Sequence, residues 1–94
     1  MIVVETIVAI PGLTPQIVTD IFDACADLSE HRDDLDEVSA YASLDSSEVT
    51  VTMVVLSDHV DAAVGRSSEA VAELMQSATV AMEVTSIHGD LIGA

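Results

Sequence analysis

Residues 2 to 15 read IVVETIVAIPGLTP, and this stretch decides the fold. Nine of these residues, up to Ile10, are almost all apolar and mostly β-branched, which predicts a central strand covered on at least one face. The Pro-Gly pair ends the strand. Thr14 is a favourable helix N-cap, and Pro15 suits the first helical position, where its missing N–H would have had no partner in any case. The chain therefore opens with a strand that is followed at once by a helix.

The next segments predict one helix and a hairpin. Apolar residues recur at helical spacing from Ile17 to Leu28, and aspartates and a glutamate occupy the opposite face. Apolar and polar residues then alternate over residues 38–44 and 49–55, as expected for two strands. The short polar turn at residues 45–47 joins them as a hairpin.

The last third of the chain predicts a second helix and a final strand. Ser57 or Asp58 can cap the helix, whose apolar face extends to Ala78, and Gly65 is the point at which it could break. A weaker alternation over residues 80–87 predicts a strand, and residues 88–94 are expected to form a tail.

This element order predicts an α+β fold, the ferredoxin-like βαββαβ sandwich, in which a four-stranded antiparallel sheet carries two helices on one face. The 94 residues are expected to form a single domain over residues 1–94. The first and third strands are then central, and the other face of the sheet has no helix over it. If even positions of the first strand and odd positions of the third face the helices, the open face carries Val3, Glu5, Ile7, Tyr41, Thr50, Thr52, Val54, Glu83, Thr85 and Ile87.

The apolar members of the open face predict an interface. We expect a homodimer or a larger homo-oligomer that covers Val3, Ile7, Tyr41, Val54 and Ile87, because monomers seldom expose a contiguous apolar patch. The alternative is an open sheet wetted by its threonines and glutamates.

The charge balance excludes several partners. The chain has seventeen acidic residues and only two arginines, Arg32 and Arg66, so the net charge is −15. Such a surface repels nucleic acid and anionic membranes. The acidity reports either the habitat of the protein or a basic partner. A lone cysteine, Cys25, and the absence of a signal-peptide pattern favour the cytoplasm.

No residue cluster predicts catalysis, a metal or a cofactor. The acidic stretch from Glu30 to Glu37 lacks the glycine and distal glutamate of a calcium loop. The histidines His31, His59 and His88 fall in separate segments without zinc-ligand spacing. Cys25 lies on the apolar stripe of the first helix, where inert packing is expected. Lysine is absent, and phosphate-binding glycine loops are also missing.

The turn Ile10-Pro11-Gly12-Leu13 between a strand and an amphipathic helix resembles the opening of ACT domains, which are regulatory modules of the same element order. The resemblance implies binding of a small molecule at a subunit interface. The free backbone N–H groups of a helix start favour a small anion. The candidate ligand-binding residues are Pro11, Gly12, Leu13, Thr14 and Gln16.

These observations favour a non-enzymatic ligand-sensing or protein-interaction module that self-associates through its open sheet face or an edge strand. A structural protein that forms rings or larger oligomers is one alternative. A third interpretation is a small dimeric α/β-barrel enzyme, since the layout is similar to that group of small monooxygenases and degradative enzymes. That enzyme would use His59 or His88 beside an acid.

Overall fold

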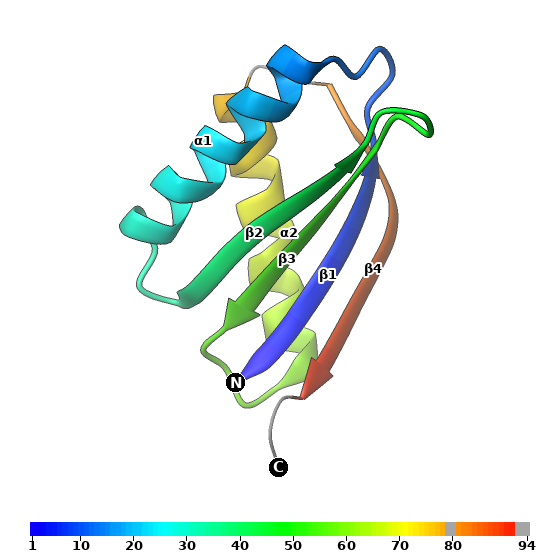
Figure 1. Ribbon diagram of the computed structural model, residues 1–94. Coiled ribbons are helices and arrows are strands. Elements are labelled where there is room, and N and C mark those ends of the chain that lie inside the picture. The colour runs from blue at the N-terminus through cyan, green and yellow to red at the C-terminus, as the bar shows by residue number, and fades with distance from the viewer. Residues whose placement is uncertain (79–80, 92–94) are drawn as a thin grey trace.

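The computed structural model describes residues 1–78 and 81–91 and has βαββαβ order (Figure 1). Its elements are β1 (Ile2–Ala9), α1 (Pro15–His31), β2 (Leu35–Ser43), β3 (Glu48–Val55), α2 (Val60–Ser77) and β4 (Glu83–Leu91). The strands form one antiparallel sheet in the order β2-β3-β1-β4. The predicted ferredoxin-like α+β fold is confirmed, with β1 and β3 in the centre.

The two helices cover the same face of the sheet and leave the other face open (Figure 1). α1 packs on β2 and on α2, whereas α2 packs on β1, β4 and β3. Residues on the covered face of the central strands are fully buried, among them Val4 of β1 and Val51 and Met53 of β3. Each buried aliphatic side chain of this kind stabilises the fold by roughly 1.5–3 kcal/mol. The predicted alternation of β1 and β3 is therefore confirmed.

The start of α1 follows the capping signals of the sequence. The Thr14 hydroxyl accepts a hydrogen bond from the Ile17 N–H at 3.3 Å, and Pro15 is the first helical residue. Gly12 precedes the cap with a φ of +74°, a conformation that side chains with a Cβ rarely adopt. The turn thus reverses the direction of the chain after β1, so that α1 packs along the sheet.

Several boundaries differ from the sequence prediction. β2 begins at Leu35, three residues early, so Asp36 and Glu37 belong to a strand rather than to an acidic loop. β4 runs to Leu91, so residues 88–91 are a strand and not a tail. Residue 80, the predicted start of this strand, and residues 92–94 of the predicted tail lie outside the described residues.

A register shift marks the middle of β4. Ile7 pairs with Ser86 and Val8 with Val84, so Thr85 has no partner on β1 and forms a β-bulge. The Thr85 hydroxyl donates a hydrogen bond to the Ile7 carbonyl at 3.1 Å. Because side chains alternate between the two faces of a strand, one extra residue inverts the faces of all the residues that follow.

Helix α2 continues through Gly65 without a break. A Cβ at Gly65 would meet no atom within 4 Å, and the same is true at Gly12, where only φ is unfavourable. Gly65→Ala is therefore expected to raise the free energy of unfolding by about 1 kcal/mol. Gly12→Ala is expected to lower it by about 1–2 kcal/mol, the cost of left-handed backbone. Urea unfolding of both variants measures the two free energies of unfolding. If both variants were stabilised, or both destabilised, the backbone conformations assigned to Gly12 and Gly65 would be contradicted.

None of the helices in the described residues is long and apolar enough to cross a membrane.

Candidate functional site

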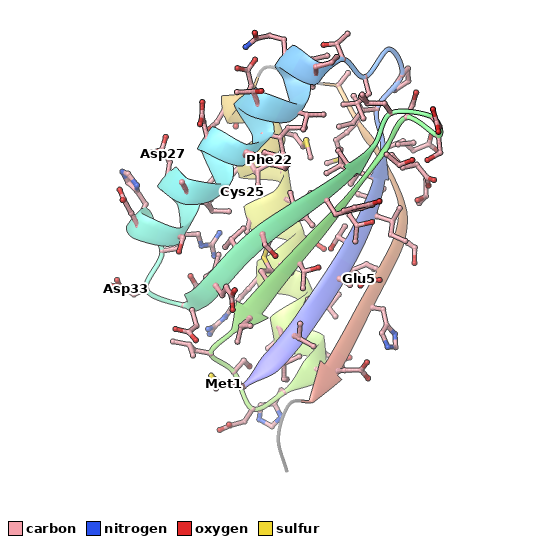
Figure 2. The ribbon with its side chains drawn as sticks, in the orientation of Figure 1. Met1, Glu5, Phe22, Cys25, Asp27 and Asp33 are labelled. Atoms are coloured by element: carbon pink, nitrogen blue, oxygen red, sulfur yellow. The ribbon has the colours of Figure 1, made fainter. Side chains whose placement is uncertain are left out.

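The uncovered sheet face combines apolar and acidic side chains. Val3, Ile7 and Val54 are partly buried there, and Tyr41 is 73% exposed. Figure 2 shows the Glu5 side chain on this face of β1. The register of the sheet places the following residues on the same face: Val3, Glu5, Ile7, Glu37, Ser39, Tyr41, Glu48, Thr50, Thr52, Val54, Glu83, Ser86, His88 and Asp90.

A histidine–aspartate pair lies on the β4 side of this face. His88 Nε2 is 2.9 Å from Asp90 Oδ2, and both side chains are about two-thirds exposed. Glu5 is the cross-strand partner of His88, and Val3 is the partner of Asp90. When the carboxylate accepts a hydrogen bond from Nε2–H, the other ring nitrogen, Nδ1, has no hydrogen and can accept a proton. The pair therefore has the arrangement of a general base held by an acid.

The bulge at Thr85 positions this pair. Without the extra residue, the alternation that places Glu83 on the open face would direct His88 and Asp90 toward the helices. With it, Ser86, His88 and Asp90 all share the open face with Glu5. β-Bulges are over-represented at sheet edges, such as β4, and next to active sites, where they redirect side chains.

The same bulge corrects the prediction for Ile87. The side chain was expected on the open face and in the interface, but Ile87 pairs with Thr6, which is buried under the helices. Ile87 packs partly buried against the core. The other four predicted interface residues, Val3, Ile7, Tyr41 and Val54, do lie on the open face, and their role in an interface stays a prediction.

Several residues of the predicted ligand-binding turn are buried or form hydrogen bonds within the protein. Leu13 is buried, and its N–H donates to the Ile10 carbonyl at 3.2 Å. The Thr14 hydroxyl caps α1, and Gln16 donates to the Asp20 carboxylate on the next helical turn at 3.1 Å. Pro11 and Gly12 are exposed in the bend before them. Thr14 and Gln16 are exposed as well, and the binding of a small anion at this turn stays a prediction.

The remaining candidates do not converge on one place. Cys25 is buried on α1, and burial raises the pKa of its thiol to about 11, which disfavours the nucleophilic thiolate. His31 contacts the Asp27 carbonyl on its own helix, and His59 is the N-cap residue of α2. Across residues 1–78 and 81–91, no three histidine, cysteine or acidic side chains lie close enough to hold a metal ion.

Arg32 joins three segments on the covered side of the molecule. Its guanidinium binds Asp34 with two nitrogens, at 3.0 and 2.8 Å, and reaches Glu73 of α2 at 3.2 Å. The end of α1, the entry to β2 and α2 are thereby tied together. This bidentate hydrogen bonding to Arg32 lowers the pKa of Asp34. We interpret this cluster as a set of stabilising contacts and not as a ligand-binding or catalytic site.

Replacing Arg32 by methionine is expected to lower the free energy of unfolding by about 1 kcal/mol at neutral pH. Because the pKa of Asp34 is lower in the folded state, the pair stabilises the fold fully above the unfolded pKa of about 4 and loses this contribution as the pH falls through the folded pKa. The difference in the free energy of unfolding between wild type and Arg32→Met should therefore become smaller in acid. Urea unfolding at a series of pH values measures this difference, and a difference that stays constant into acid would contradict the linkage.

The sequence shows Asp90 as the acid near His88, but both residues were assigned to a tail, so their place on the open face of a strand was not predicted. One signal was available. Ser86, His88 and Asp90 are polar and alternate with Ile87 and Gly89, as in a strand that continues past residue 87. The inversion of faces at Thr85 carried no such signal, because a bulge depends on the pairing of β4 with β1.

The protein is therefore a small α+β sandwich that carries a histidine–aspartate pair on the open face of its sheet. No protein-family model matches the chain, and no curated protein matches it. Solved structures are similar in fold. The structural-genomics protein YjcS matches with a TM-score of 0.69 and 6% sequence identity, over 98% of each chain. A protein from Deinococcus radiodurans, described as a candidate antibiotic biosynthesis monooxygenase, matches with a TM-score of 0.58 and 11% identity, over 100% of this chain and 94% of its own.

These neighbours correct the functional prediction. A non-enzymatic ligand-sensing or interaction module was expected, on the resemblance of the first turn to ACT domains, and no family model confirms that resemblance. The Deinococcus protein is instead described as an enzyme. Of the interpretations drawn from the sequence, the small enzyme is the one that agrees with this description.

Proposed function

We propose that this protein is a small enzyme of the dimeric α/β-barrel type, with its active site between the open sheet faces of two copies. The observation that carries the proposal is the His88–Asp90 pair, which lies on the uncovered face with Glu5 opposite it. The Deinococcus neighbour described as a candidate monooxygenase shares the fold over nearly all of both chains and supports an enzymatic role.

Two copies are needed because one open face offers no enclosed volume. Val3, Ile7, Val54 and Tyr41 supply apolar surface that a second sheet would bury, and burial of apolar area is the main driving force for such association. A covered face also excludes water from His88 and strengthens its interaction with Asp90.

The chemistry that the pair can perform is proton abstraction from a small substrate. His88 Nδ1 accepts the proton, and Asp90 orients the imidazole and stabilises its charged form. The face also carries Glu5, Glu37, Glu48 and Glu83. These carboxylates repel anions, so the substrate is expected to be neutral or cationic.

The oligomeric state provides the first test. Light scattering should find a dimer at micromolar concentration, and moderate salt should favour it by screening the repulsion between two chains of charge −15. Val54→Lys places a charge on the open face, within the proposed interface between the two copies. This variant is expected to be a monomer. Ala62→Lys adds the same charge on an exposed position of α2 and should leave the dimer intact. A wild-type monomer would refute the two-copy site.

Turnover provides the second test. Purified protein is incubated in D₂O with a panel of small neutral phenols, hydroquinones and 1,3-dicarbonyl compounds. NMR follows exchange of substrate C–H for deuterium, and an oxygen electrode follows O₂ uptake. We expect catalysis of one of these reactions that vanishes with the dimer in Val54→Lys and survives in Ala62→Lys. Equal activity of the wild type and Val54→Lys would refute the site.

A further inference from the structure

A second apolar surface lies between α1 and the edge strand β2. One hollow of about 380 Å³ is lined by Pro15, Val18 and Phe22 of the helix, by Ala40, Ala42 and Leu44 beside the sheet edge, and by Tyr41, where the hollow meets the open face. A neighbouring hollow of about 280 Å³ shares Phe22 and Ala40 with it. Together they form one groove, which we name the α1–β2 groove. Figure 2 shows Phe22 projecting from α1 toward β2.

Two large apolar side chains of the groove are about half exposed. Phe22 is 46% exposed and Leu44 48%, although Val18, Ala40 and Ala42 next to them are partly buried against the core. Phe22 is also the only phenylalanine of the chain. Large aromatic side chains in apolar grooves are frequent anchors of protein contacts.

The groove borders unpaired backbone. Within residues 1–78 and 81–91, β2 pairs with β3 alone, so its outer edge presents N–H and C=O groups to an incoming strand. Proteins with exposed edges either protect them or use them to bind an extended peptide by strand addition. An added strand would direct alternate side chains into the groove on either side of Phe22.

Charge selects the occupant. The exposed acids Asp33, Asp36 and Asp45 lie within β2 or close to its ends. The nearby Arg32 is already bound to Asp34 and Glu73. A second copy at this edge would bring the same acids against one another, whereas a basic segment would be attracted. Charge therefore favours an extended basic peptide over self-association.

We propose that the α1–β2 groove binds an extended segment of a partner protein, which adds as a strand to β2, places apolar side chains around Phe22 and carries lysine or arginine at the intervening positions. This surface adjoins the open face at Tyr41 and does not include the His88–Asp90 pair.

The test uses an acetylated, amidated ten-residue peptide in which leucine or valine alternates with lysine, titrated into the ¹⁵N-labelled full chain. Saturable amide shifts are expected in β2 and α1, and added salt should weaken binding. Two control peptides separate the contributions: glutamate in place of lysine removes charge attraction, and N-methylation at alternate positions removes the strand hydrogen bonds. Each control is expected to bind at least about tenfold more weakly.

Protein variants locate the site. Phe22→Lys and Leu44→Lys should each weaken binding about tenfold or more, whereas Ala62→Lys on α2 should not. Thermal unfolding confirms that each variant is folded, and the two groove variants are independent of each other. No saturable shift in β2, equal binding of the glutamate peptide, or shifts confined to the open face would overturn the proposal. Line broadening in β2 that depends on protein concentration without peptide would instead identify a second copy as the occupant.

Discussion

Replacing His88 by glutamine is expected to lower kcat of the proposed enzyme by about 10²- to 10⁴-fold, the range that one general base contributes. Glutamine keeps a hydrogen bond to Asp90 but offers no nitrogen that takes up a proton near neutral pH. The KM should change little, because the substrate is held mainly by the apolar residues of the face. Steady-state kinetics on the substrate found in the panel measure both parameters.

Three control variants give this prediction its specificity. Asp90→Asn keeps the imidazole but removes the carboxylate that orients it, so a smaller fall in kcat is expected. His59→Gln changes the N-cap residue of α2 and should leave kcat unaltered. Ser86→Ala, on the same face and strand, controls for surface changes. A His88→Gln enzyme with wild-type kcat would remove His88 from the mechanism.

Replacing Ile87 by aspartate is expected to lower the free energy of unfolding by about 3 kcal/mol or more. Ile87 lies on the face of β4 that packs under the helices, opposite Thr6, so the change removes apolar burial and places a charge against the core. At this position Ile87→Val is expected to cost only about 1 kcal/mol. Urea unfolding followed by circular dichroism gives both values.

The matched control is Ser86→Asp, one residue earlier on the same strand. Ser86 is exposed on the open face, so an added charge there should change stability by no more than about 0.5 kcal/mol. Uninterrupted alternation from Glu83 would reverse the two results, because it places Ile87 outward and Ser86 inward. A larger loss in Ser86→Asp than in Ile87→Asp would therefore contradict the bulge at Thr85.

The element order was predictable because it depends on local properties of the chain. The β-branched run before Pro11 forms a strand, Thr14 and Pro15 begin a helix, and residues 45–47 form the turn of a hairpin. These features act over a few residues, and the right-handed crossover then leaves few arrangements. Boundaries were less accurate where local signals are weak, as at Leu35, where pairing with Val55 extends β2 into an acidic stretch.

The candidate site could not be predicted in the same way. Glu5 and His88 are 83 positions apart in the sequence and become cross-strand neighbours only when β4 pairs with β1. Asp90 reaches His88 because both follow the same bulge. The α1–β2 groove likewise depends on the position of α1 over an edge strand, which leaves Phe22 partly uncovered.

The sequence alone therefore determined the ferredoxin-like βαββαβ order, the buried alternation of β1 and β3 and the net negative charge of the chain. Tertiary structure decided which side of β4 faces the helices, and so which residues share the open face. The physical reason is that helix caps, turns and alternation are set by neighbours in the chain, whereas the bulge at Thr85 is set by hydrogen bonds to a distant strand.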